Sequence, residues 1–492
     1  MSEEPNPKMT DPSVVPAARV GQARRWTILG FAVALSLVVS AAIFGYRHLS
    51  KPAPPVPIPS NLAGLDPMLR NYVTEKVAWV RESPRDSNRQ ATLGLVYAAN
   101  GLWPEAGLAF QNAAQLDPQQ PLALLYLAVC QQELGQPDRA LGLLRELTNH
   151  FPSFAPGFYR LGDYALRVGG IEEAEHAFRR LIKLAPREWR GFAGLGEVNL
   201  RRGDAAGAAS LLEQAMRIDP TAKPVHALLG QAYQRQGRAG EAQRELALGL
   251  NASHYPMPDA WSEQAQQHMR LPFDLIEMAQ DYIKTGAPAK AVQLLEKAAP
   301  FHPDHPSLLV TLASAYTLAG EPWKARPILD HVLQVDTSCV PAYVALSGCD
   351  LALGQVDQAL NNADRAILLD TNRAEPYLAK ANALLAQERD AEAVAALELA
   401  HRCDSNNAQI LLDLGDIRLR NLDQPDLALA DYRLATARDP SLVLAHLRVA
   451  ELSLKMGDRS SAVASLEAAR QLAPTDPTIA AALERLKRKP PP

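Results

Sequence analysis

The chain has 492 residues, of which 47% are hydrophobic and 21% are charged, and its net charge is −4. This composition is typical of a folded protein, and the small negative charge excludes a general electrostatic attraction to nucleic acid. Four cysteines in so long a chain exclude a disulfide-rich scaffold, and the scarcity of aromatic residues, at 6%, favours helices over strands.

The first element predicted in chain order is a transmembrane helix over residues 26–46, after an N-terminal tail of residues 1–25. The segment from Trp26 to Tyr46 carries no charge, and about 20 apolar residues span a bilayer as a helix. Arginines are slightly more frequent on its N-terminal side, so we expect a plasma or inner membrane protein whose C-terminal part is extracytoplasmic. Two alternatives stay open: a cytoplasmic C-terminal part, or secretion after cleavage of a signal peptide.

A proline-rich linker is predicted over residues 47–65. Five prolines lie between Lys51 and Ser60, and such a composition favours an extended, semi-rigid spacer that holds the following part away from the lipid headgroups. A helix over residues 66–84 comes next, since Asp66 followed by proline is typical of a helix start.

From residue 85 onward the sequence repeats with a regular period. Each of eleven units carries one alanine, here called the anchor alanine: Ala106, Ala140, Ala174, Ala208, Ala242, Ala291, Ala325, Ala359, Ala393, Ala428 and Ala462. Successive anchor alanines are 34 or 35 positions apart, except for one step of 49. A small residue stands 12 positions before nearly every anchor alanine, a glycine stands five positions before it in nine units, and a proline stands 12 positions after it in seven.

These recurring positions predict two helices in every unit. Leucine, alanine and tyrosine recur at helical spacing before the glycine, which indicates a first amphipathic helix that ends where the glycine adopts a left-handed conformation. The second helix carries the anchor alanine, and the proline ends it. The small residues allow the two helices to approach closely. Because neither helix buries its apolar face alone, the units must stack.

The pattern resembles the tetratricopeptide repeat family, most closely in Ala91–Pro118, and one departure is Glu388 in place of the turn glycine of unit 9. The resemblance implies an all-α solenoid, a right-handed superhelix of helix–turn–helix units. Units 1–5 then cover residues 85–254 and units 6–11 cover residues 270–474, between the capping helix of residues 66–84 and a C-terminal capping helix and tail over residues 475–492. It also implies a concave surface, lined by the first helices, that binds protein or peptide partners.

The step of 49 places an insert at residues 255–269, between units 5 and 6. Two prolines in it prevent a simple continuation of the helix, and Asp259 is positioned to cap a short one. We predict a packed connector in which Trp261 fills the junction between the two halves. The alternative is a hinge or a loop that contacts a partner, with Trp261 as a candidate binding residue.

A row of basic residues stands seven positions before four successive anchor alanines: Arg167, Arg201, Arg235 and Lys284. Stacking of the units would align them as a docking surface for an acidic peptide. The alternative is that they end the first helices in solvent, where cations favour the helix dipole. Acidic residues such as Asp163 and Glu197, four positions earlier, would then neutralise them.

Motifs for catalysis, metal binding or cofactor binding are not found. A phosphate-binding loop, a nucleophile elbow, a zinc-protease motif and an EF-hand loop are all missing from the sequence. The Lys and Asn clamp by which some members of the family hold a C-terminal carboxylate is replaced by Tyr159, Asp163, Ala193 and Glu197. The cysteines Cys130, Cys339, Cys349 and Cys403 are expected to be unpaired thiols. We therefore expect no cofactor, no metal and no enzymatic activity.

The function predicted from these features is that of a membrane-anchored scaffold for protein–protein interactions in the cell envelope. The alternative is an accessory or regulatory subunit of an envelope enzyme or of an export or assembly machine.

Overall fold

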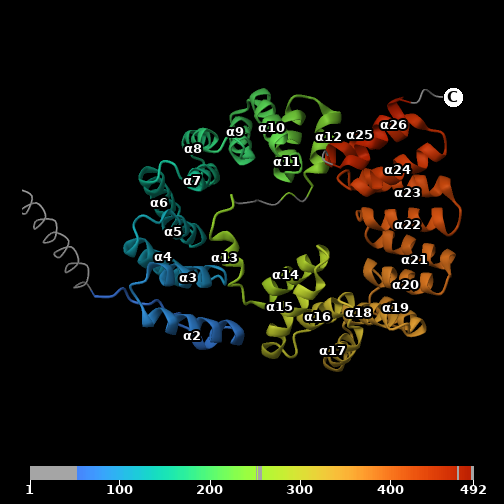
Figure 1. Ribbon diagram of the computed structural model, residues 1–492, viewed down its shortest axis with the longest axis horizontal. Helices are drawn as coiled ribbons and strands as arrows, with labels where there is room; N and C mark the ends of the chain where they lie inside the picture. The colour runs from blue at the N-terminus through green and yellow to red at the C-terminus, as the bar shows by residue number, and fades with distance from the viewer. Residues whose placement is uncertain (1–51, 251, 253–256, 474–475, 489–492) are drawn as a thin grey trace, which may run out of the picture. The chain divides into compact units, whose positions relative to one another are not determined.

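The computed structural model describes residues 52–250, 252, 257–473 and 476–488, and within these ranges it contains 25 α-helices and no strand (Figure 1). The chain divides into two compact units, residues 1–55 and residues 56–492, of which the second is described here. The prediction of an all-α repeat solenoid is thereby confirmed. The predicted transmembrane segment, residues 26–46, lies outside the described ranges, and no helix inside them has both the length and the apolar character to cross a membrane.

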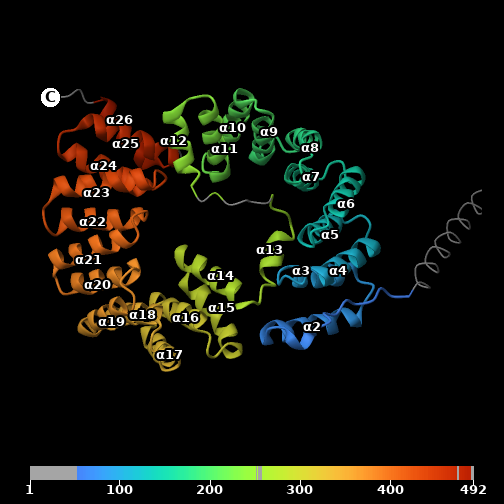
Figure 2. The ribbon, with the colours of Figure 1, turned by 180° about the vertical axis from the view of Figure 1, so that it is seen from behind.

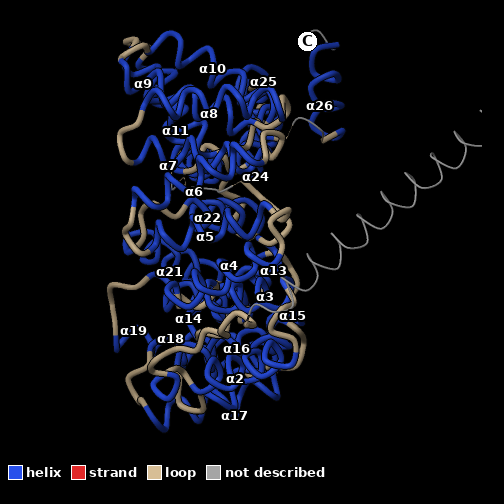
Figure 3. Tube along the Cα trace, turned by 90° about the vertical axis from the view of Figure 1, so that its left-hand side faces the viewer, coloured by secondary structure: helices blue, strands red, loops and turns tan. Residues whose placement is uncertain are grey.

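Short loops connect most of the successive helices in the described ranges (Figure 3). The elements are η1 (Leu62–Gly64), α2 (Pro67–Glu82), α3 (Ser87–Ala98), α4 (Trp103–Leu116), α5 (Pro121–Glu133), α6 (Pro137–His150), α7 (Ala155–Arg167), α8 (Ile171–Leu184), α9 (Trp189–Arg202), α10 (Ala205–Ile218), α11 (Lys223–Arg235), α12 (Ala239–Leu248), α13 (Ser262–Gln266), α14 (Pro272–Lys284), α15 (Pro288–Ala298), η2 (Ala299–Phe301), α16 (Pro306–Leu318), α17 (Pro322–Val335), α18 (Val340–Ala352), α19 (Val356–Leu369), α20 (Ala374–Ala386), α21 (Asp390–Cys403), α22 (Ala408–Arg420), α23 (Pro425–Arg438), α24 (Val443–Lys455), α25 (Arg459–Leu472) and α26 (Pro477–Arg488).

The helices pack as successive pairs. The first and second helices of each unit contact each other, from α3 with α4 in unit 1 to α24 with α25 in unit 11. Each second helix also packs on the first helix of the next unit, with one exception. The helix α12 of unit 5 has no extensive contact with α14 of unit 6, and the two lie apart in Figures 1 and 2. The repeats therefore form two stacks, and the insert connects them.

Turn residues in the left-handed conformation separate the two helices of each unit. All nine of the predicted turn glycines have a positive φ, between 67° and 90°. Glu388, which replaces the glycine in unit 9, has a φ of 60°, and Asp423 in unit 10 has a φ of 52°. The predicted turn position is thus confirmed, and two non-glycine residues adopt a conformation that is unfavourable for them.

The small residues of the first helices face bulky residues of the second helices. A Cβ atom at Gly94 would lie 2.7 Å from the ring of Phe110, and one at Gly162 would lie 2.8 Å from the ring of Phe178. Both rings follow an anchor alanine by four positions and are almost completely buried. Close packing of the helix pair therefore requires a small residue here, as predicted.

The second half of the proline-rich linker packs on the first repeat. Pro57 and Pro59 are buried, and the hydroxyl of the fully buried Tyr97 donates a hydrogen bond to the carbonyl oxygen of Pro57 at 2.7 Å. Val56 and Leu62 pack on the same core. Residues 56–65 are therefore part of the folded unit, whereas the sequence predicts an extended, semi-rigid spacer over residues 47–65.

All four cysteines are free thiols, as predicted. Cys130 and Cys349 are fully buried within the first helices α5 and α18. Burial, followed by the nearby carboxylate of Glu133, raises the pKa of the Cys130 thiol to about 12, which makes this thiol unreactive at neutral pH.

Candidate partner-binding surfaces

The predicted basic row is divided between the two stacks. Arg167, Arg201 and Arg235 lie at the ends of α7, α9 and α11, and these three first helices contact one another in order. Lys284 ends α14, which packs on α15 and α16 of the other stack. The prediction that all four side chains align through stacking is wrong, because the insert interrupts the stack between α12 and α14.

Acidic residues of the same helices pair with part of this row. Arg167 lies 3.0 Å from Asp163, and Arg201 lies 2.7 Å from Glu197, each pair at the i,i+4 spacing of one helix. Such exposed pairs contribute only about 0.3–0.5 kcal/mol each. The pairs nevertheless reduce the net positive charge that the row presents to an acidic partner.

Two arginines of the row also connect consecutive repeats. Arg201 donates a hydrogen bond from Nη1 to the carbonyl oxygen of Leu166, 2.6 Å away at the end of α7, and Arg235 donates in the same way to Leu200 at the end of α9. The last carbonyl groups of a helix lack partners within that helix, so a guanidinium satisfies them well. Sequence reasoning missed this role, although the recurrence of arginine at the same helix end in consecutive units was the available signal.

A small groove crosses the first helices α7, α9 and α11. It has a volume of about 80 Å³ and is lined in part by Tyr159, Asp163, Trp189, Ala193 and Glu197. These include all four positions that replace the carboxylate clamp of the family. Their carboxylates would repel a terminal carboxylate, while the aromatic rings offer an apolar contact.

The electrostatics of this groove are mixed. The guanidinium of Arg190 lies 4.5 Å from the centre of the Trp189 ring, and it forms an ion pair with Glu188 at 2.7 Å. The arrangement combines a flat aromatic surface with charges of both signs on neighbouring repeats. Groups of this kind bind a protein side chain and its backbone rather than a small charged molecule.

The insert packs on units 1 and 2, although in the sequence it connects units 5 and 6. We call residues 257–271 the strap. Its Trp261 is only 8% exposed and packs on Phe110 of α4, with ring centres 6.0 Å apart and planes inclined by 20°, and on Tyr126 of α5, with ring centres 5.5 Å apart. Figures 1 and 2 show α13 of the strap beside α3, which it contacts. The prediction that Trp261 fills the junction between units 5 and 6 is therefore wrong about its location.

Asp259 shapes the strap and attaches it to unit 2. Its Oδ1 accepts hydrogen bonds from the backbone N–H groups of Trp261 and Ser262, at 2.8 and 3.1 Å, so it orders the turn before α13. The N-cap residue of α13 is Trp261, and not Asp259 as predicted. The hydroxyl of Tyr126 donates to the same oxygen at 3.2 Å. Burial, and then the charge of Asp259, raise the pKa of Tyr126, which keeps this hydroxyl protonated as a donor.

The C-terminal end of the strap is held by residues of unit 1 and of α2. Asn100 is 5% exposed; its Nδ2 donates to the carbonyl oxygen of His268 and its Oδ1 accepts from the N–H of Arg270, both at 2.8 Å. The hydroxyl of Tyr72 lies 2.7 Å from Nδ1 of His268, and the guanidinium of Arg270 lies 3.9 Å from the centre of the Tyr72 ring. The strap thus covers Tyr72 on the N-terminal capping helix.

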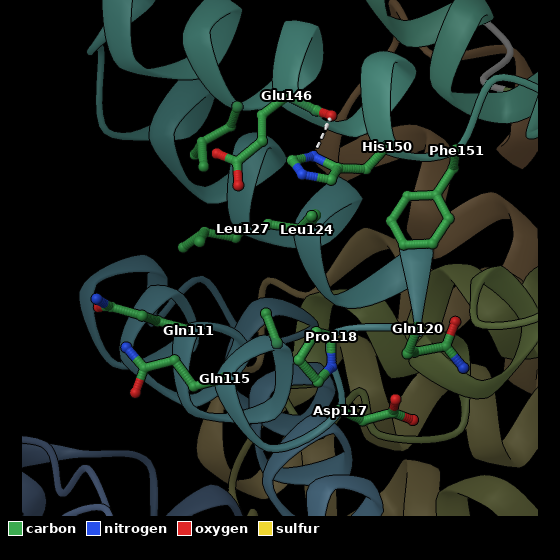
Figure 4. A pocket seen from close by; sticks show the side chains of 12 residues that line it. Gln111, Gln115, Asp117, Pro118, Gln120, Leu124, Leu127, Glu146, His150 and Phe151 are labelled. Carbon is green, nitrogen blue, oxygen red and sulfur yellow. Dashed lines mark hydrogen bonds between the residues drawn. The ribbon is translucent and has the colours of Figure 1, made fainter.

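A larger cavity, of about 300 Å³, lies between the helices α4, α5 and α6 (Figure 4). Leu124, Leu127 and Phe151 contribute apolar walls, and His150 lies near its rim with Nδ1 3.0 Å from the carbonyl oxygen of Glu146. Charged groups do not converge on a common point in this cavity, so its chemistry suggests no specific ligand.

Metal-binding groups do not gather anywhere in the described ranges: no three His, Cys, Asp or Glu side chains are placed to share an ion. The histidines of the His302–His305 segment have other contacts. Nε2 of His302 lies 3.6 Å from the carboxylate of Asp66, at the start of α2. This contact joins the N-terminal capping helix to the second stack.

Models of the tetratricopeptide repeat match residues 97–161, 199–266 and 282–348, and a second model of the same repeat matches residues 159–223. The helix pairs, turn glycines and small-residue contacts described above have the same period.

The repeats in these matched ranges are tetratricopeptide repeats.

Several solved structures are similar to this chain. Yeast Tom70 is 13% identical, with 82% of this chain and 95% of that chain covered and a TM-score of 0.40. A tetratricopeptide repeat protein from Parabacteroides merdae is 19% identical, with coverages of 55% and 99% and a TM-score of 0.35. A thermophilic tetratricopeptide repeat protein from Thermus thermophilus is 22% identical, with coverages of 37% and 99% and a TM-score of 0.30.

Proposed function

We propose that this chain is a membrane-anchored scaffold that binds a protein partner on the first helices of units 3–5. The observation that carries the proposal is the groove across α7, α9 and α11, where Tyr159 and Trp189 lie beside charged residues of α7 and α9. Aromatic side chains framed by polar groups are typical of the centre of a protein interface.

The partner segment in this proposal contains acidic residues. They compete with Asp163 and Glu197 for the arginines of the basic row. The side chain of Arg167 is 52% exposed, and its ion pair with Asp163 is weak enough to be exchanged for a partner's carboxylate. Arg201 and Arg235 also donate to backbone carbonyl groups of the preceding repeat, so they position the surface as well as line it.

The anchor in this proposal is the uncharged segment of residues 26–46, with the repeats on the extracytoplasmic side of a plasma or inner membrane. Its length and the flanking arginines support this placement. A reporter fused after Lys51 is expected to be active outside the cytoplasm. A reporter that is active only in the cytoplasm would place the repeats on the other side.

Charge reversal tests the binding surface. We expect Arg167→Glu to weaken capture of the partner from a detergent extract at low salt. The matched control is Arg179→Glu on the second helix α8, because Arg179 is 65% exposed and has a similar i,i+4 ion pair, with Glu175. Equal capture of the partner by both variants would refute the proposal that this surface binds it. Capture of one enzyme in a fixed ratio would identify the accessory-subunit alternative.

A further inference from the structure

We propose that the first two repeats form a second peptide-binding site, which the strap occupies as an internal ligand. A partner segment with the pattern Asp-x-Trp displaces the strap from Tyr126, Phe110 and Asn100. This proposal extends the scaffold function and rests on it, but it concerns units 1 and 2 rather than the groove over units 3–5.

A single side chain anchors the strap. Among residues 257–270, Trp261 alone is buried, and the rest are half-buried or exposed. Phe110 and Tyr126 form the surface that receives its indole ring. One aromatic anchor in an aromatic pocket, surrounded by weaker contacts, is how a peptide ligand binds a protein surface.

The backbone of the strap is recognised independently of its sequence. Asn100 forms two hydrogen bonds with the main chain of residues 268–270, one as a donor and one as an acceptor. A third bond, from Nδ2 to the carbonyl oxygen of Val96 in the preceding helix α3 at 2.7 Å, fixes the amide in this orientation. Any extended segment offers the same pair of backbone groups, so Asn100 would hold a partner chain equally well.

The acidic part of the pattern comes from Asp259. Its carboxylate accepts from the Tyr126 hydroxyl, two residues before the tryptophan that packs on the same ring. Burial keeps this hydroxyl a donor, so the site prefers an acceptor at this position. The partner that fits is therefore a segment with an aspartate two residues before a tryptophan.

The repeats that the strap covers also pack on one another directly, although Trp261 is part of their buried core. The helix α13 of the strap has five residues, and α3, α4, α5 and α6 pack on one another in the regular order of the stack. Because the strap is tethered, its effective concentration is in the millimolar range, so only a partner that binds more tightly than the strap displaces it.

The test uses a fluorescent peptide of residues 257–271 and the full chain in detergent. We expect the peptide to bind the Trp261→Ala chain, in which the internal strap is weakened, at least about tenfold more tightly than the wild-type chain. Asn100→Ala or Tyr126→Phe, added to Trp261→Ala, should reduce this binding. A peptide with alanine at the tryptophan should not bind.

Three results would overturn the proposal. The first is no binding to a Trp261→Ala chain that retains its helix content, because the strap would then be a permanent part of the fold. The second is equal binding to both chains. The third is a wild-type dimer that Trp261→Ala dissociates, because the strap would then bind a second copy. The two proposed sites are distinguished by two variants of the Trp261→Ala chain. The strap peptide should no longer bind when Asn100→Ala is added, but it should still bind when Arg167→Glu is added. Either proposal can therefore fail alone.

Discussion

His268 is the strap residue whose charge opposes docking. Burial, and then the positive charges of Arg270 in the strap and Lys76 on α2, lower the pKa of its imidazole to about 4. The Tyr72 hydroxyl, also on α2, lies against its Nδ1. The docked strap therefore favours the neutral imidazole, whereas an undocked strap has a histidine pKa of about 6.5.

We predict that docking weakens as the pH falls. Because the pKa is lowered in the docked state, the stabilisation is complete above about pH 6.5 and is lost progressively towards pH 4. The strap peptide should bind the Trp261→Ala chain on the order of tenfold more weakly at pH 5 than at pH 7. A peptide with His268→Gln is the control, and its affinity should stay constant. Equal affinity of the natural peptide at both pH values would contradict the prediction.

Glu388 shows how a single residue carries backbone strain. Its φ of 60° is accessible to glycine without cost, and nine other units have glycine at this turn. We predict that Glu388→Gly stabilises unit 9 by about 1 kcal/mol. Gly354→Ala, at a φ of 74° in the preceding unit, should have the opposite effect. Hydrogen exchange of the amides of α20 and α21 measures the effect of Glu388→Gly on unit 9. The amides of α18 and α19 report the effect of Gly354→Ala on unit 8. Slower hydrogen exchange in the Gly354→Ala variant than in the wild-type chain would contradict this prediction.

At the scale of the helices, ion pairs between units reinforce the apolar stack. Arg418 of α22 donates from Nη1 to Asp431 of α23 at 2.6 Å and from Nη2 to Glu398 of α21 at 2.5 Å, and its side chain is only 13% exposed. Burial raises the pKa of Asp431, and the hydrogen bond from Arg418 counteracts this rise. The network therefore joins unit 9 to unit 10 through a buried charge.

We predict that Asp431→Ala destabilises units 9 and 10 by about 3–5 kcal/mol, because it leaves the charge of Arg418 buried with one partner fewer. Glu392→Ala breaks the exposed pair with Arg389 and should change stability little. Hydrogen exchange in α21, α22 and α23 distinguishes the two variants. Equal loss of stability in the two variants would show that burial does not determine how much these ion pairs contribute to stability.

Helices and turns were predictable because the residues that encode them are neighbours in the sequence. The repeat period predicted the turn glycines and the close approach of paired helices at small residues such as Gly94, since both depend on spacing within one unit. The bond from Arg201 to Leu166 was not predictable, because its acceptor is a backbone carbonyl, and every residue has one. The location of Trp261 was also hidden, because Phe110 belongs to the first unit, at the other end of the stack, and no local pattern connects them.

At the scale of the whole folded unit, the insert brings the second stack back to the beginning of the first. Met68 of α2 packs on the core that contains Leu275 of α14, and His302 lies beside Asp66. Deletion of residues 255–269 restores the regular step between anchor alanines, but α14 cannot both follow α12 and stay beside α2.

We therefore predict that this deletion leaves units 1–5 folded and separates α2 from the second stack. Cysteines at Asp66 and His302, in a chain with Cys339→Ser and Cys403→Ser, should be joined by a short bismaleimide in the wild-type background and not in the deletion variant. Helix content from circular dichroism controls for unfolding. Crosslinking that persists after the deletion would show that the strap does not determine this contact.

The bonds of Asn100 to the strap have a consequence for the order of events during synthesis. They join residues 168 and 170 positions apart, whereas the helix pairs of the solenoid pack mainly on adjacent units. Translation at about 5–20 residues per second takes roughly 9–34 s to cover this distance. Units 1 and 2 emerge and pack within that interval, because their contacts are local and form quickly. Every newly made chain thus passes through a period in which Phe110, Tyr126 and Asn100 are uncovered, and a partner present where the chain folds meets this site without competition from the strap.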